Sequence, residues 1–174
     1  LDTSGSMTGN KIDQARDALI YVLEQLNPED RFNVIAFSTG VRHYAYDLQP
    51  ASDADEAIDW VDGLDASGGT NINQALLETL DYVEERPTVV IFLTDGLPTE
   101  GETDIQQILD NVIATAEDNV RLFPFGVGDD VNTTLLDTLA AQQRGITGYV
   151  RPHERIDEEI SSFYSRMRTP VLAD

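Results

Sequence analysis

Side chains that carry oxygen are concentrated in three short segments of the chain. The first is Asp2-Thr3-Ser4-Gly5-Ser6, and the others are Gly68-Gly69-Thr70-Asn71 and Thr94-Asp95-Gly96. Asp2, Asp95 and the hydroxyls of the Ser and Thr residues form a hard, all-oxygen donor set. Such a set suits Mg²⁺, Mn²⁺ or Ca²⁺ rather than zinc or copper. If the fold brings the three segments together, the chemistry they predict is the binding of one divalent cation.

The first segment has the spacing that such a site requires. Alternate residues of an extended loop point the same way, so Asp2, Ser4 and Ser6 can converge while Thr3 faces elsewhere. Gly5 permits a tight turn between the two serines. The alternative for this segment alone is a helix cap, since Asp and Ser are preferred at that position. The other two segments, taken singly, are ordinary turn sequences, and only their joint order favours a site.

The rest of the sequence alternates helical and β-rich patterns. Apolar residues at helical spacing predict helices over residues 11–26, 53–61, 72–83, 105–116, 132–141 and 156–167. Runs rich in β-branched and aromatic residues predict strands over residues 31–38, 41–46, 88–93, 120–125 and 148–150. The alternation predicts an α/β fold with three layers, in which helices flank a doubly wound, mostly parallel central sheet.

This fold would place all three segments at one edge of the sheet. Residues 88–93 (TVVIFL) form a continuous apolar run, which is typical of a central strand covered on both faces. Thr94-Asp95-Gly96 follows this run, and Asp2 stands where an earlier strand would end. Ligands of open α/β sheets bind just outside the carboxyl ends of the strands. The donor set is therefore expected to converge there.

Taken together, the motifs resemble the metal-ion-dependent adhesion site of von Willebrand factor A domains, which have a Rossmann-like fold. The similarity is greatest to the A domain of inter-alpha-trypsin inhibitor heavy chains, through Met7, Lys11-Ile12 and the segment 30–38 (DRFNVIAFS). Because the match runs in order along nearly the whole chain, residues 1–174 are expected to form a single A domain. In the family several apolar residues precede the motif in a central first strand. Here Leu1 alone precedes it, so we expect a fragment with a truncated first strand.

The resemblance also implies roles for the five donors. Ser4 and Ser6 would bind the metal directly, Thr70 directly or through water, and Asp2 and Asp95 mainly through water. The expected ion is Mg²⁺, with Mn²⁺ or Ca²⁺ as alternatives. Neutral hydroxyls leave most of the ion's charge uncompensated, so an open position would favour a carboxylate from a partner protein. The implied function is metal-dependent protein binding in adhesion or complex assembly.

Two other functions fit parts of the pattern. The same site could dock another subunit in a complex with an AAA+ ATPase, as in metal chelatases. A magnesium-dependent phosphotransfer enzyme with Asp2 as nucleophile is the other alternative. No catalytic triad is evident, and His43 and His153 are interpreted as surface or packing residues. The sequence therefore favours a binding domain over an enzyme.

Charge narrows the class of partner. Asp and Glu total 32 against 11 Lys and Arg, the net charge is -21, and Lys11 is the only lysine. Such a surface should repel nucleic acid and anionic lipid, so a protein partner with basic residues around its carboxylate is expected. The acidity indicates adaptation to high salt, with an ordinary acidic surface as the alternative.

Other features of the sequence leave the compartment and the assembly state open. No cysteine is present, which excludes disulfides. Because no apolar run reaches the roughly 18 residues that span a bilayer, direct membrane insertion is not expected. The family resemblance favours an extracellular or cell-surface location, and the oligomeric state stays open.

Overall fold

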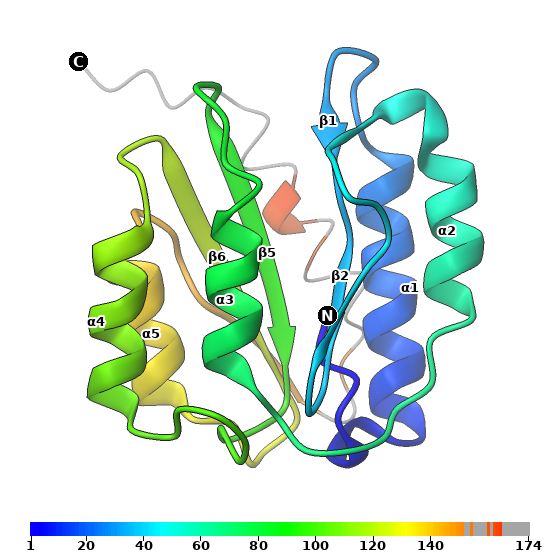
Figure 1. Ribbon diagram of the computed structural model, residues 1–174. Coiled ribbons are helices and arrows are strands. Elements are labelled where there is room, and N and C mark those ends of the chain that lie inside the picture. The colour runs from blue at the N-terminus through cyan, green and yellow to red at the C-terminus, as the bar shows by residue number, and fades with distance from the viewer. Residues whose placement is uncertain (152–153, 155–159, 161, 165–174) are drawn as a thin grey trace.

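Figure 1 shows the computed structural model, which describes residues 1–151, 154, 160 and 162–164. The helices are α1 (Asn10–Glu24), α2 (Ala54–Asp62), α3 (Ile72–Leu80), α4 (Ile105–Thr115) and α5 (Thr133–Gln142), with 3-10 turns η1 (Gly5–Met7) and η2 (Ala51–Asp53). The strands are β1 (Arg31–Phe32), β2 (Ile35–Phe37), β3 (Val41–His43), β4 (Gln49–Pro50), β5 (Thr88–Thr94), β6 (Val120–Val127) and β7 (Gly148–Val150).

The sheet consists of a parallel part and two antiparallel pairs. β5, β6 and β7 are parallel and lie in that order, while β2 pairs with β3 and β1 pairs with β4. The first three residues join β2 to β5. Thr3 N donates to Phe37 O at 2.7 Å, and Asp2 N donates to Leu93 O at 2.8 Å. The amino terminus therefore lies inside the sheet, next to the carboxyl end of β5.

Helices cover both faces of this sheet, with α1 and α2 on one side and α3, α4 and α5 on the other (Figure 1). Alternate residues of the strands divide between the two cores. Leu93 and Phe125 pack in the cluster that contains α1, whereas Phe92 and Leu122 pack in the cluster that contains α3, α4 and α5. Each large apolar side chain buried in this way stabilises the fold by roughly 1.5–3 kcal/mol. The predicted three-layer α/β fold with a mostly parallel sheet is confirmed.

The predicted elements match the structure closely except between residues 31 and 50. Residues 31–38 were expected to form a single strand, but this is wrong because β1 and β2 are separate. The side chain of Asn33 interrupts the ladder, since its Oδ1 accepts from Val34 N at 2.8 Å and its Nδ2 donates to Ala45 O at 2.7 Å. β4, which pairs with β1, was not predicted. Ile160 and residues 162–164 are helical, and the rest of the predicted helix 156–167 lies outside the described residues.

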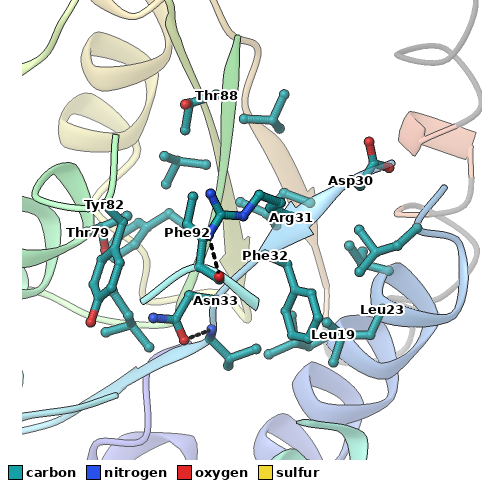
Figure 2. Close-up of a pocket in the computed structure, with 18 of the residues that line it drawn as sticks. Leu19, Leu23, Asp30, Arg31, Phe32, Asn33, Thr79, Tyr82, Thr88 and Phe92 are labelled. Atoms are coloured by element: carbon teal, nitrogen blue, oxygen red, sulfur yellow. Dashed lines mark hydrogen bonds between the residues drawn. The ribbon is translucent and has the colours of Figure 1, made fainter. Parts of the chain in front are cut away.

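A cavity of about 610 Å³ lies between β5 and the segment that carries β1 and β2. Figure 2 shows Leu19, Leu23 and Phe32 on its α1 side, with Thr79 and Tyr82 on the side of α3. At one end the Leu1 amino group donates to Ile35 O at 2.7 Å. Leu93 O accepts from Asp2, and backbone groups alternate between the two edges of a strand. Val89 and Ile91 therefore also direct N–H and C=O groups toward the cavity.

Candidate metal-binding site

Asp2 is fixed by hydrogen bonds to both carboxylate oxygens. Ser4 N donates to Oδ1 at 2.8 Å, and the Thr94 hydroxyl donates to Oδ2 at 2.6 Å. Asp2 and Thr94 are both fully buried, and Thr3 anchors the loop by donating through N and Oγ1 to Phe37 O. The carboxylate is thereby held beside the end of β5, with its orientation set by the fold.

Ser4 and Ser6 are brought together by the turn η1. Their Oγ atoms lie 3.0 Å apart, and the Ser6 hydroxyl donates to Asp95 Oδ1 at 2.8 Å. Met7 is completely buried and anchors the turn, whereas Ser6 is exposed. The two hydroxyls and the Asp95 carboxylate thus form a continuous row of oxygens that opens toward solvent at Ser6.

The loop of residues 67–70 is packed against this first loop by backbone hydrogen bonds. Gly5 N donates to Gly68 O at 2.9 Å, and Ser67 N donates to Thr3 O at 2.8 Å. Gly68 has φ +85°, and a Cβ there would lie only 2.8 Å from Thr39 Oγ1. Glycine at position 68 is therefore required both by its backbone conformation and by the space available.

Thr70 lies across Gly96 from the serines. Its N donates to Thr99 Oγ1 and its carbonyl accepts from Thr99 N, both at 2.9 Å, and the residue is buried. A Cβ placed on Gly96 would lie 3.7 Å from Thr70 Oγ1 and 3.9 Å from Ser6 Oγ. Glycine thus leaves the space between these two hydroxyls free of any side chain.

The structure therefore brings all five predicted donors to one edge of the sheet. Ser4, Ser6 and Asp95 are in direct contact, Asp2 is linked to them through Ser4 N, and Thr70 lies beside Gly96. Whether these residues hold a metal stays a prediction.

Three residues at this edge were not predicted as part of the site. Thr94 and Thr99 position Asp2 and Thr70, and the Lys11 ammonium lies 2.6 Å from Asp95 Oδ2. Lys11 was noted as the only lysine of the chain, but its place a few residues after the motif was not taken as a sign that it belongs to the site. Thr94 could have been assigned to the site because it is next to Asp95 in the sequence, whereas nothing in the sequence singles out Thr99.

Burial changes the acidity of two groups at the amino terminus. Burial raises the pKa of the Asp2 carboxyl above its usual value, and the nearby Asp95 adds to this, although hydrogen bonds from Thr94 and Ser4 oppose the rise. Burial also lowers the pKa of the Leu1 amine to about 5, against the effect of Asp2. The ionised form of Asp2 is therefore unfavourable here without a positive charge, and a dication would supply one.

The spacing of the two serine hydroxyls is compatible with binding of one hard cation. Mg–O distances of about 2.0–2.1 Å at right angles place two ligand oxygens roughly 2.9 Å apart, close to the 3.0 Å between Ser4 Oγ and Ser6 Oγ. Ca²⁺ also accepts this spacing, because angles of about 72° in a pentagonal bipyramid bring oxygens at about 2.3–2.6 Å to roughly 2.7–3.1 Å from each other. Within the described ranges no group of three or more His, Cys, Asp or Glu could hold a metal. An ion at this edge would therefore depend on the hydroxyls.

His43 lies away from this site, on β3. Its Nε2 is 2.6 Å from Glu78 Oε2 and its Nδ1 is 2.8 Å from the Tyr82 hydroxyl, in a half-buried packing arrangement. His153 lies outside the described residues. Across the part of the chain that is described, no helix combines the length and apolar character that a bilayer span demands.

Comparison with known proteins finds relatives that align with almost the whole of this chain. The chain is 39% identical to the human (Homo sapiens) inter-alpha-trypsin inhibitor heavy chain H4 and 33% identical to the mouse (Mus musculus) heavy chain H2. Both alignments cover 99% of this chain but only 20% of the relative, so the chain spans about a fifth of the length of these proteins.

Structural comparison gives the same result. A von Willebrand factor type A protein from Catenulispora acidiphila superposes with a TM-score of 0.81 at 25% identity, over 93% of this chain and 40% of that one. The family model of the von Willebrand factor type A domain matches residues 1–159. The chain therefore belongs to the von Willebrand factor type A domain family.

Proposed function

We propose that this domain binds a protein partner through a divalent cation, with Mg²⁺ as the preferred ion and Mn²⁺ or Ca²⁺ as alternatives. Ser4, Ser6 and Thr70 would supply hydroxyl ligands, and Asp2 and Asp95 would support the ion mainly through water. The observation that carries the proposal is the row of oxygens formed by Ser4, Ser6 and Asp95, with spacings of 3.0 and 2.8 Å.

The chemistry of this row favours an outside carboxylate as an additional ligand. Both oxygens of Asp2 and both oxygens of Asp95 already accept hydrogen bonds within the domain. Hydroxyl ligands are neutral, so a bound dication would keep most of its charge. Ser6 is exposed, so a partner can approach from that side. A carboxylate of the partner would then complete the coordination of the ion.

The charge of the domain restricts which partners can bind. With a net charge of -21, the domain repels acidic proteins at low ionic strength. A partner that offers Asp or Glu within a basic surface would overcome this repulsion, as would high salt, which shortens the range of the field. The proposed partner is therefore a protein with a carboxylate surrounded by Arg or Lys.

The enzymatic alternative is less consistent with the geometry. A nucleophilic carboxylate needs an oxygen that the substrate can reach, yet Asp2 is 0% exposed and has both oxygens occupied by donors. Lys11, the lysine that could steady a phosphoryl group, is paired with Asp95. Docking to an ATPase subunit would use the same cation and the same open position, so it is a special case of the proposed binding.

Calorimetric titration with MgCl₂ tests the cation, and a peptide tests the partner. Asp2→Ala should abolish Mg²⁺ binding, whereas Thr70→Ala should keep the fold and weaken peptide binding more than stability. The peptide would carry one Glu among arginines, with a Gln version as its matched control. We expect binding of the Glu peptide with Mg²⁺ and no binding with a chelator. Unchanged Mg²⁺ affinity in Asp2→Ala, or equal binding of both peptides, would refute the proposal.

A further inference from the structure

Lys11 makes an ion pair with a carboxylate of the candidate site. Its Nζ lies 2.6 Å from Asp95 Oδ2, and the Asp95 side chain is completely buried while that of Lys11 is 29% exposed. The other oxygen of Asp95 accepts from Ser6. Both oxygens of this buried carboxylate are therefore satisfied by groups of the domain itself.

The fold directs Lys11 toward Asp95. Lys11 stands in the first turn of α1, and its side chain passes over Gly128 at the end of β6. A Cβ on Gly128 would lie 3.0 Å from Lys11 Cε and 3.3 Å from Nζ, and Gly128 has φ +95°. The loop is held by Gly128 N, which donates to Val150 O at 2.8 Å. Glycine at position 128 thus suits both the backbone conformation and the close passage of the lysine.

This arrangement puts a permanent positive charge beside the place where the cation would bind. A buried carboxylate without a positive partner is costly, so the ion pair with Lys11 holds Asp95 in position when no metal is present. Once a dication binds at Ser4 and Ser6, the ammonium faces it across the same carboxylate. Like charges at such short range repel strongly when they are partly shielded from water.

We propose that Lys11 is a built-in counter-ion of the site, which holds Asp95 in place in the metal-free domain and limits the affinity for the divalent cation. The proposal rests on the proposed function, because it assumes that the cation binds at Ser4 and Ser6. It assigns Lys11 as a positioning residue that acts through Asp95.

Calorimetric titration of the whole chain with MgCl₂ tests this at fixed ionic strength. Lys11→Met removes the charge and should tighten Mg²⁺ binding about tenfold, because the repulsion is lost. Lys11→Gln keeps an N–H donor toward Asp95 without the charge and should show the same tightening, even if Lys11→Met folds poorly. Lys11→Arg keeps the charge and should bind like the wild type. Thermal unfolding with a chelator should give lower midpoints for both neutral variants.

Arg121→Met is the matched control for net charge, because Arg121 is exposed near the start of β6, at the opposite end of that strand from the site. Its Mg²⁺ affinity should equal that of the wild type. If the wild type binds Mg²⁺ and both neutral variants bind equally or more weakly, Lys11 is not a counter-ion that limits affinity. Equal tightening in Arg121→Met would likewise overturn the inference, since overall charge would explain it. If the wild type itself binds no Mg²⁺, the proposed function fails and this inference fails with it.

Discussion

At the scale of single residues, the site is built from buried polar groups whose partners are all supplied by the domain. Asp2 is held by Ser4 and Thr94, and Asp95 by Ser6 and Lys11. Such networks fix orientation, but they leave the ionised form of Asp2 unfavourable because burial raises its pKa. The metal-free domain therefore carries a local electrostatic penalty, which a dication would remove.

The substitution Asp2→Asn tests whether the ionised carboxylate of Asp2 lowers the stability of the metal-free domain. Because the pKa of Asp2 is raised by folding, the folded state binds the proton more tightly, and the wild type loses stability as pH rises above the usual carboxyl pKa. Asn does not titrate, so with a chelator at pH 7 Asp2→Asn should unfold at higher urea than the wild type. Its Mg²⁺ affinity should be lost. A lower urea midpoint at pH 7 would contradict the proposed penalty.

At the scale of elements, helix starts and loops determine where the donors stand. Asn71 Oδ1 accepts from Gln74 N at 3.1 Å and so caps α3, directly after Thr70. Asn132 caps α5 in the same way through Leu135 N at 3.0 Å. The two caps are chemically alike, but the cap of α3 adjoins a candidate ligand, so it should influence the site as well as stability.

The two caps form a matched pair of tests. Asn71→Ala and Asn132→Ala should each lower the free energy of unfolding by about 1 kcal/mol, the usual effect of losing an N-cap. Asn71→Ala should also weaken Mg²⁺ binding, because the position of Thr70 depends on the start of α3. Asn132→Ala should leave the Mg²⁺ affinity unchanged. Urea denaturation and calorimetry measure the two effects, and equal Mg²⁺ affinity in both variants would exclude this role for Asn71.

At the scale of the whole molecule, two features dominate: the cavity beside β5 and the excess of negative charge. The cavity separates β5 from β1 and β2 except where Leu1, Asp2 and Thr3 join them. Its walls combine apolar side chains such as Leu19 and Phe92 with polar and charged ones such as Asp30, Arg31 and Asn33 (Figure 2). That residues 1–174 form a single A domain stays a prediction.

Salt should stabilise the domain. With 32 acidic and 11 basic residues, repulsion between carboxylates opposes folding, and the screening length falls from about 10 Å at 0.1 M to about 3 Å at 1 M. We expect the thermal midpoint to rise as KCl is increased from 0.1 to 2 M. Unfolding that worsened as KCl was added would exclude adaptation to high salt.

The sequence by itself determined the fold class and most helices and strands, and it predicted the residues of the candidate site. These follow from local patterns: helical or alternating spacing of apolar residues, and short motifs whose order along the chain is informative. The strand over 88–93 and the helix over 105–116 were predicted within a residue of β5 and α4 because their apolar patterns leave little choice. The five candidate ligands were predicted because their segments follow predicted strands or precede predicted helices.

Only the tertiary structure determined which side chains contact each other across the site. The contacts between Lys11 and Asp95 and between Thr94 and Asp2 join residues 84 and 92 positions apart, and no local pattern specifies such a pairing. The break between β1 and β2 depends on Asn33 bonding to Ala45, which requires β3 and the turn after it to be in place. Spacing along the chain fixes which face of an element a side chain occupies, whereas the charge opposite it depends on how the elements pack.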